Sequence, residues 1–185
     1  MQVIIVILKF GKIYNIIMNI KSFISVIPHI KENTLIICDI DETFLRYEKG
    51  FGYFYDKVKS KQKTKRDALK QTNLIYRDYK QTNDPKFTDY PGFMLMLHIL
   101  KDKGELVFLT ARSLEEEKGT RKEFSFLGIN YDYFKVFYTS DRITKGGFIK
   151  KNFKIKGKNV LFIDDYIGNI ESVSKIPSIK CFKFI

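Results

Sequence analysis

Short apolar runs alternate along this chain with amphipathic segments, and the alternation predicts the order of its elements. Five runs are rich in apolar residues on both faces, as the buried strands of a parallel sheet are. They cover residues 34–39, 105–110, 134–138, 159–163 and 179–184. Segments whose apolar residues recur at helical spacing lie between these runs. They extend from Asp89 up to Gly104 and over residues 114–127, 147–153 and 167–174. Strands that alternate with helices predict an α/β fold, a doubly wound (Rossmann-like) parallel sheet of five strands.

The segment between the first strand and the first of these helices predicts an insert. Residues 44–55 hold two glycines among aromatic residues, a composition typical of a loop or hairpin. Residues 56–83 have one apolar face and are otherwise mostly charged, as in an exposed helix, which Asp84-Pro85 ends. We expect residues 46–88 to form a small helical cap over the carboxyl ends of the strands, within a single domain of residues 1–185.

The N-terminal residues fit this alternation less well. Residues 1–17 contain the apolar run Val3–Leu8, which is too short to span a bilayer. It also lacks the basic flank and cleavage site of a signal peptide. We expect either an additional strand or leader sequence upstream of a start at Met18. Residues 19–31 carry Ile and Phe at helical spacing and predict a short helix or turn packed on the core.

Charge indicates the kind of partner. The 185 residues carry a net charge of +12, and residues 46–90 hold twelve basic and six acidic residues, half of that charge. Such a balance favours anionic partners, namely phosphorylated small molecules or polyanions such as nucleic acid. A solvated basic surface explains the charge equally well. No segment predicts a membrane span.

The two cysteines predict no disulfide framework. Cys38 belongs to the first predicted strand and Cys181 to the last. If these strands lie about two spacings apart, about 10 Å separates them, beyond the reach of a disulfide. We therefore expect an intracellular, reducing compartment, the cytoplasm.

Polar residues follow four of the predicted strands where each strand ends. They are Asp39 and Asp41 after the first, Thr110 in Leu-Thr-Ala-Arg after the second, Lys145 after the third, and Asp164 with Asp165 after the fourth. Because the carboxyl ends of parallel strands meet at one edge of the sheet, where ligands bind, we expect these side chains to converge. Two carboxylates spaced i, i+2 are common by chance. The prediction therefore rests on the presence of such residues, in order, after all four strands.

The run Asp-Ile-Asp-Glu-Thr that begins at Asp39 resembles the first motif, D-x-D-x-T, of the haloacid dehalogenase (HAD) superfamily. The five residues of this run are similar to the same motif in the acid phosphatases and protein phosphatases of that superfamily. The Leu-Thr-Ala-Arg run, and Phe-Ile-Asp-Asp followed by Asn169, strengthen the resemblance, which spans residues 35–184. It implies a Mg²⁺-dependent phosphatase, a hydrolase of phosphate monoesters, and a sheet with strand order 3-2-1-4-5, numbered along the chain.

The resemblance also implies catalytic roles. Asp39 would be the nucleophile that forms an aspartyl-phosphate. Asp41 would protonate the leaving oxygen and then take a proton from water. Thr110 would hold a phosphoryl oxygen, and Lys145 would bridge the phosphate and Asp39. Lys150 and Lys151 lie close enough in the sequence to be alternatives for the lysine.

A metal site and substrate contacts complete the implied set. Mg²⁺ prefers a few carboxylates with water and phosphate oxygens. It would be held by Asp39, the backbone carbonyl of Asp41 and Asp164, with Asp165 as a ligand or a partner of the lysine or of the metal's water. Substrate contacts are expected from Thr43, Arg112, Lys57 and Lys59.

Other chemistries find less support. The sequence has no G-x-x-x-x-G-K-[ST] and no G-x-G-x-x-G phosphate loop. Its two histidines, His29 and His98, and two cysteines are too scattered to predict a zinc site. A nucleotide or nucleic-acid-end phosphatase is the alternative within enzymes. A nucleic-acid-binding or scaffold protein with a vestigial site is the alternative outside them, and the oligomeric state stays open.

Overall fold

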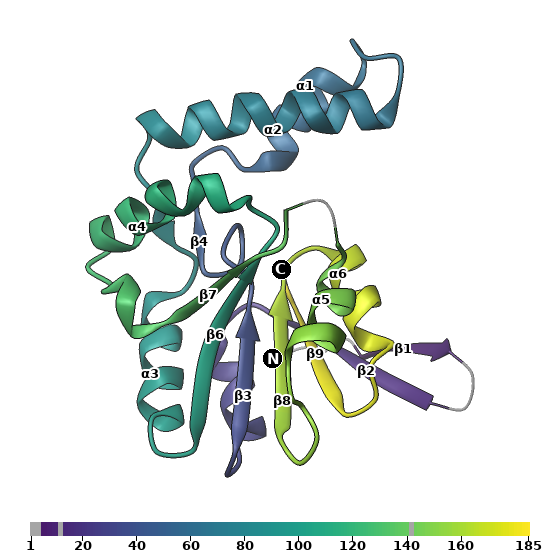
Figure 1. Cartoon of the computed structure of the whole chain (residues 1–185), viewed down its shortest axis with the longest axis vertical. Coiled ribbons are helices and arrows are strands. Elements are labelled where there is room, and N and C mark those ends of the chain that lie inside the picture. The colour runs from purple at the N-terminus through teal and green to yellow at the C-terminus, as the bar shows by residue number, and fades with distance from the viewer. Residues whose placement is uncertain (1–4, 11–12, 141–142) are drawn as a thin grey trace.

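The computed structural model of the chain describes residues 5–10, 13–140 and 143–185, with side chains from Ile17 onward. Its centre is a seven-stranded sheet of order β1-β2-β9-β8-β3-β6-β7 (Figure 1). The α/β class predicted from the sequence is confirmed. The predicted five strands are all present and parallel: β3 (Thr34–Cys38), β6 (Gly104–Thr110), β7 (Lys135–Tyr138), β8 (Asn159–Asp164) and β9 (Ile179–Phe184).

The strand count of the prediction was too low. The five predicted strands are neighbours in the order β7-β6-β3-β8-β9, and two more extend the sheet beyond β9. β2 (Ile13–Ile20) pairs with β9 in parallel, and β1 (Ile5–Phe10) pairs with β2 antiparallel. Two alternatives were expected for residues 1–17. In the described part, residues 5–10 and 13–17 are in strands, in agreement with the alternative of an additional strand, while residues 1–4 and 11–12 lie outside the described part.

Helices cover both faces of the sheet, because the residues of the central strands point alternately to either side. On one face, Ile36 and Cys38 pack in a core with α3 (Tyr90–Leu100), α4 (Glu117–Phe126) and the 3₁₀ helix η1 (Phe23–His29). On the other, Leu35 and Ile37 pack with α5 (Lys145–Asn152) and α6 (Ile167–Ser174). The 3₁₀ helices η2 (Leu114–Glu116) and η3 (Tyr131–Tyr133) flank α4. The central strands are thereby buried between two layers of helices.

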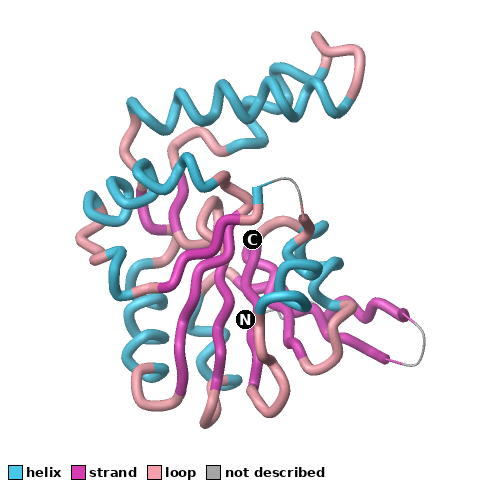
Figure 2. The backbone as a smooth tube through the Cα atoms, viewed as in Figure 1, coloured by secondary structure: helices cyan, strands magenta, loops and turns pink. Residues whose placement is uncertain are grey.

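The insert is a helical hairpin above the carboxyl ends of the strands (Figure 1). Its base is a two-stranded ribbon, β4 (Leu45–Arg46) with β5 (Lys86–Phe87). The single helix predicted over residues 56–83 is two helices, α1 (Phe51–Lys59) and α2 (Lys65–Thr82). The break arises because the Thr64 side chain accepts a hydrogen bond from the Asp67 backbone N–H at 3.1 Å and so starts a new helix. Figure 2 shows the connecting loop at the far end of the hairpin.

Two boundaries near the site differ from the prediction. Gly104 was expected to follow the end of α3, but it is the first residue of β6. A Cβ there would lie 1.9 Å from the backbone oxygen of Thr34, so close strand pairing requires glycine. The helix expected near residues 147–153 begins earlier, at Lys145, because Thr144 caps it through the Gly147 backbone N–H. Lys145 thus lies in the first helical turn.

The cysteines and the helices bear on two further expectations. Cys38 on β3 and Cys181 on β9 are separated by β8 and are both buried free thiols, so the expectation of no disulfide is confirmed. Among the helices in the described part of the chain, none combines the length and the apolar character that crossing a membrane requires.

Candidate active site

Three carboxylates gather where β3 and β8 end. Asp39 follows β3, Asp164 is the last residue of β8, and Asp165 comes next. The two strands are paired in parallel, and the Asp39 backbone N–H donates to the Ile163 oxygen at 2.9 Å, which fixes their ends side by side. One oxygen from each carboxylate lies within 4.8 Å of the others. The sequence prediction placed Asp39, Asp164 and Asp165 at these strand ends, and the structure brings the three carboxylates together.

A buried lysine bridges two of these carboxylates. The Lys145 ammonium donates to Asp39 Oδ1 at 2.5 Å and to Asp164 Oδ2 at 2.7 Å. Burial alone would lower the pKa of Lys145, but Asp164 and Asp39 outweigh it and raise that pKa, so the side chain is charged. Lys150 and Lys151, the alternatives from the sequence, are exposed. The lysine at the carboxylates is therefore Lys145.

The cluster has an excess of negative charge. Three carboxylates face one ammonium, and burial raises the pKa of Asp39 against the opposing effect of Lys145. Burial and the neighbouring Asp164 raise the pKa of Asp165 to about 7. A cation would relieve this repulsion, and carboxylate oxygens are the ligands that Mg²⁺ prefers. The donor set of Asp39, Asp164 and Asp165 fits such an ion.

Further hydrogen bonds orient the carboxylates. Asn169 Nδ2 donates to both oxygens of Asp164, at 3.2 and 3.1 Å, and the Tyr166 backbone N–H donates to Asp164 Oδ1 at 2.9 Å. The fully buried Thr43 hydroxyl donates to Asp165 Oδ1 at 3.3 Å. Thr43 was predicted to contact substrate, and in the structure its hydroxyl donates to a carboxylate of the cluster. Partners of this kind fix the orientation of metal ligands.

Thr110 lies at the end of β6, the other neighbour of β3. Its hydroxyl oxygen is buried and accepts a hydrogen bond from the Arg112 backbone N–H at 3.2 Å. In the described part of the chain the Thr110 hydroxyl proton has no recorded acceptor. It is therefore available to a ligand oxygen at the strand ends.

The Asp41 carboxylate points into a different set of contacts. Arg112 binds it with two parallel hydrogen bonds, Nε to Oδ2 at 2.7 Å and Nη2 to Oδ1 at 2.8 Å. Lys80, carried by α2 of the insert, lies 3.6 Å from Asp41 Oδ1. Burial would raise the pKa of Asp41, but Arg112 and Lys80 together hold it well below its usual range. Asp41 is thus an ionised, doubly paired carboxylate in this structure.

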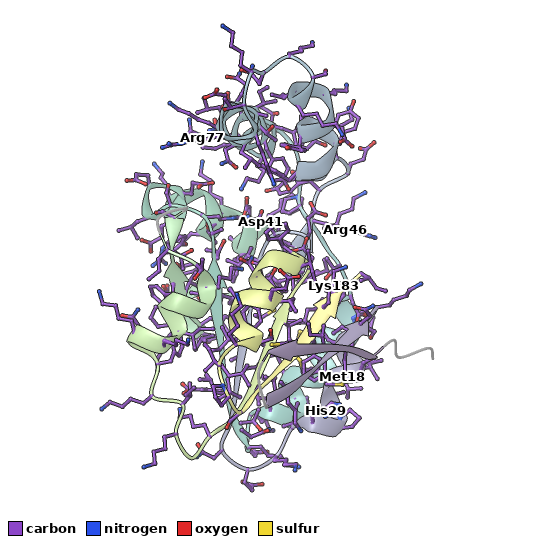
Figure 3. All side chains as sticks on the ribbon, turned by 90° about the vertical axis from the view of Figure 1, so that its right-hand side faces the viewer. Met18, His29, Asp41, Arg46, Arg77 and Lys183 are labelled. Atoms are coloured by element: carbon purple, nitrogen blue, oxygen red, sulfur yellow. The ribbon has the colours of Figure 1, made fainter. Side chains whose placement is uncertain are left out.

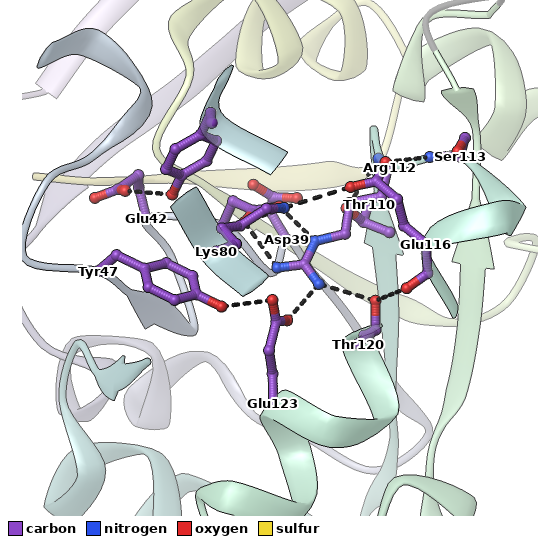
Figure 4. A network of polar contacts seen from close by, with 12 residues as sticks. Asp39, Glu42, Tyr47, Lys80, Thr110, Arg112, Ser113, Glu116, Thr120 and Glu123 are labelled. Carbon is purple, nitrogen blue, oxygen red and sulfur yellow. Dashed lines mark hydrogen bonds and ion pairs between the residues drawn. The ribbon is translucent and has the colours of Figure 1, made fainter. Parts of the chain in front are cut away.

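Arg112 continues the network toward α4 (Figure 4). Its Nη1 donates to Thr120 Oγ1 at 2.8 Å and to the Glu123 carboxylate, which also accepts from the Tyr47 hydroxyl at 2.6 Å. Lys80 lies 3.5 Å from Glu116 Oε1. Arg112 was predicted to contact substrate. In the structure its guanidinium instead bridges the carboxylates of Asp41 and Glu123.

The sequence analysis missed Lys80, Tyr47 and Glu123. Residues 116, 120 and 123 follow helical spacing, so they could be expected to share one face of a helix, but their polar character gave no sign that this face is buried. Nothing in the local sequence indicates that Lys80 reaches Asp41, because that contact depends on how the insert packs.

Lys57 and Lys59 do not join either cluster. Both are exposed on α1. Lys57 donates to the Tyr53 hydroxyl at 2.5 Å, and Lys59 pairs with Asp56 at 2.7 Å. Among the contacts of the described residues, neither lysine reaches the carboxylates, so their predicted role in substrate binding stays a prediction.

Comparisons with known proteins assign a family but no activity. The family model described as "Protein of unknown function (DUF2608)" matches residues 16–139. No curated protein sequence matches the chain.

Two solved structures have a similar backbone. A chain of a Pnkp1/Rnl/Hen1 complex is 15% identical with a TM-score of 0.47, over 82% of this chain and 46% of that one. This chain therefore spans less than half of it. A provisionally assigned beta-phosphoglucomutase from Thermotoga maritima is 14% identical with a TM-score of 0.48, over 79% and 83% of the two chains. Likeness at this level carries no argument about activity.

Proposed function

This chain belongs to the DUF2608 family, whose description names no activity, and we propose from its site that it is a Mg²⁺-dependent phosphatase of the HAD type. It would hydrolyse phosphate monoesters through an aspartyl-phosphate intermediate on Asp39. The fold class and the ordered motifs are compatible with that superfamily.

The observation that carries the proposal is the position of Lys145. Its ammonium lies between the carboxylates of Asp39 and Asp164, at the ends of two adjacent parallel strands. Phosphoryl transfer to a carboxylate needs cations that screen two anions from each other. A buried lysine whose charge is maintained by two carboxylates meets that need, and a solvated loop end would not hold a lysine in this way.

The metal would be held by Asp39, Asp164 and Asp165. When bound, it supplies positive charge that neutralises the phosphoryl oxygens. The prediction that the Asp41 carbonyl also binds it stays a prediction. The protein's own residues keep these three carboxylates in place: Lys145 holds Asp39, Lys145 and Asn169 hold Asp164, and Thr43 holds Asp165.

The reaction follows from the placement of these side chains. An Asp39 oxygen attacks phosphorus, the bond between phosphorus and the leaving oxygen breaks, and water then cleaves the acyl phosphate to release inorganic phosphate. Lys145 screens Asp39 from the incoming anion, and the Thr110 hydroxyl donates to a phosphoryl oxygen. The ionised Asp41 can take the proton from water in the second step. To protonate the leaving oxygen in the first step, Asp41 must be released by Arg112 and Lys80 and must take up a proton from solvent, which it then donates.

The insert, residues 46–88, would act as a cap over this site. Its helix α2 contributes Lys80, which lies 3.6 Å from Asp41 Oδ1. An approaching phosphate competes with Asp41 for the same cations, since both are anions. The cap would therefore couple substrate entry to the release of Asp41, the predicted acid/base, from its ion pairs.

The test is turnover of a generic aryl phosphate with and without Mg²⁺. We expect Mg²⁺-dependent release of phosphate by the unaltered protein and none by Asp39→Asn, because an amide is no nucleophile. Retained turnover in Asp39→Asn would remove Asp39 from this role. Absence of turnover with any divalent ion would favour the binding protein with a vestigial site.

A further inference from the structure

A cavity opens beside the carboxylate cluster, on the side of β9. Its volume is about 490 Å³, within the range of roughly 300–1,000 Å³ that is typical of small-molecule sites. Asp165, one of the three clustered carboxylates, lines it, so the cavity adjoins the candidate metal site at this residue, while Asp39 and Asp164 are not part of its wall. A ligand that places a phosphate at Asp39 can extend into this space.

Two cations lie on the wall of the cavity. Arg46 comes from β4 of the insert and Lys183 from β9 of the sheet, and Figure 3 labels both on one side of the molecule. No ion pair of either residue is recorded among the described side chains, although Glu42 is near enough to Arg46 for electrostatic interaction. These two cations can therefore bind an anionic group of a ligand.

The remaining wall offers aromatic and hydrogen-bonding surface. Tyr53 and Phe51 line the cavity from the start of α1, and the Tyr53 side chain is 41% exposed. Lys57 Nζ and Lys49 Nζ lie 4.2 and 5.4 Å from the Tyr53 ring centroid, which adds positive charge at that ring. Glu42, which accepts from the Tyr76 hydroxyl at 3.2 Å, offers carboxylate oxygens to ligand hydroxyl or amino groups. Flat bases stack on such rings, whatever their identity.

The other large cavity is less suited to the leaving group. It has about 470 Å³ and lies between α2 and α4, lined by Lys80, Arg112 and Glu123 among others. Lys80 and Arg112 are the partners of Asp41, and both side chains are nearly buried. That cavity thus adjoins the network at Asp41, and none of the three clustered carboxylates lines it, whereas Asp165 lines the cavity on the side of β9.

We propose, resting on the proposed phosphatase function, that the cavity at Asp165 is the leaving-group subsite and binds a nucleoside that carries a second phosphate. The reacting phosphate lies at Asp39, and the base stacks on Tyr53. The sugar hydroxyls donate to Glu42, and the second phosphate lies between Arg46 and Lys183. A nucleoside bisphosphate and the phosphorylated end of an oligonucleotide share this chemistry.

The experiment measures binding to Asp39→Asn in Mg²⁺ by calorimetry, so that turnover does not interfere. The probes are adenosine 3′,5′-bisphosphate, adenosine 5′-monophosphate, glucose 6-phosphate, a phosphotyrosine peptide and a 3′-phosphorylated oligonucleotide. We expect the bisphosphate to bind about tenfold more tightly than the monophosphate, as one charge-assisted contact contributes. Arg46→Gln and Lys183→Gln should each remove most of that difference.

Two matched controls accompany these variants. Lys86→Gln lies opposite Arg46 on β5, and Lys180→Gln lies on β9, and neither residue lines the cavity. Both should bind the bisphosphate within about twofold of the parent, since only ordinary surface charge changes. Equal losses in the controls would mean that bulk charge, not the subsite, holds the second phosphate and would overturn the proposal.

The remaining outcomes separate the two proposals. The nucleotide subsite is overturned if the mono- and bisphosphate bind equally, or if the sugar phosphate or the phosphopeptide binds more tightly than the bisphosphate. In either case, Mg²⁺-dependent aryl phosphate turnover by the unaltered protein would still support the phosphatase. Discriminating binding without any turnover would support the subsite and overturn the phosphatase. Tighter binding of the oligonucleotide than of the bisphosphate supports the subsite and identifies nucleic-acid ends as the source. The comparison of probes needs no cavity variant, so misfolding of Arg46→Gln cannot hide the result.

Discussion

At the scale of single residues, buried charges determine what the site can do. Lys145 and Arg112 are both nearly inaccessible, and each is held by two carboxylates. A buried cation of this kind is expensive to desolvate, and it is retained only with good partners. The two cations bind three of the four strand-end aspartates: Lys145 pairs with Asp39 and Asp164, and Arg112 pairs with Asp41.

Lys145→Ala should lower Mg²⁺-dependent turnover by about 10²–10³-fold, as loss of one positioned charge donor does. Lys150→Ala is the matched control, because Lys150 lies on the same helix but is exposed, and it should leave turnover close to that of the unaltered protein. Steady-state kinetics on an aryl phosphate give both values. A larger loss in Lys150→Ala would show that the lysine at the carboxylates is not the one that the reaction uses.

Arg112→Met should destabilise the fold by about 3–5 kcal/mol, because it leaves the buried carboxylates of Asp41 and Glu123 without their cation. Denaturant unfolding measures the change. Arg121→Met is the control: Arg121 also pairs with two carboxylates, those of Glu117 and Asp132, but in the open, so its loss should change stability little. Comparable losses of unfolding free energy in both variants would mean that burial of the Arg112 network does not contribute to stability.

At the scale of elements, the ends of the five predicted strands followed from local pattern to within one residue, while the contacts of the insert with the rest of the chain did not. The helix at residues 167–174 was predicted with its observed bounds, since apolar spacing and Pro177 determine them locally. The break in the insert helix was missed because the Thr64 cap lies inside an otherwise helical pattern. Gly104 was misplaced because its role depends on Thr34, seventy residues away.

The contact between the insert and Asp41 belongs to this scale and gives a prediction. Lys80→Met should loosen α2, since Lys80 ties that helix to Asp41 and Glu116. Backbone amides of α2 should exchange hydrogen about fivefold faster, equivalent to about 1 kcal/mol for such pairs. Lys70→Met, an exposed position on the same helix, is the control and should leave exchange unchanged. Unchanged exchange in Lys80→Met would show that the ion pairs do not hold the hairpin down.

At the scale of the whole molecule, the sequence predicted the α/β class and the neighbours of the central strand, and the structure agrees on both. The edge of the sheet was under-predicted, because the sequence of residues 5–10 and 13–20 shows no turn or partner signal that places these two strands beyond β9. The convergence of Asp39, Asp164 and Lys145 could be predicted because parallel strands bring their carboxyl ends together. The pairing of Asp41 with Arg112 and Lys80 could not, since Lys80 lies on the insert and Arg112 follows β6, and both meet Asp41 only in the folded chain.

The central claim is that Asp39 accepts the phosphoryl group and that Asp41 assists its release, and trapping the intermediate tests it most directly. Asp41→Asn should slow the hydrolysis of the aspartyl-phosphate by about 10²–10⁴-fold, as loss of a general base does. The variant would be mixed with aryl phosphate and Mg²⁺, quenched in acid and weighed intact, and the modified peptide would then be mapped. We predict a single phosphoryl group on Asp39 in Asp41→Asn and none in the double variant Asp39→Asn, Asp41→Asn. A variant that turns over at the unaltered rate, or a phosphoryl group mapped to any other residue, would contradict the account.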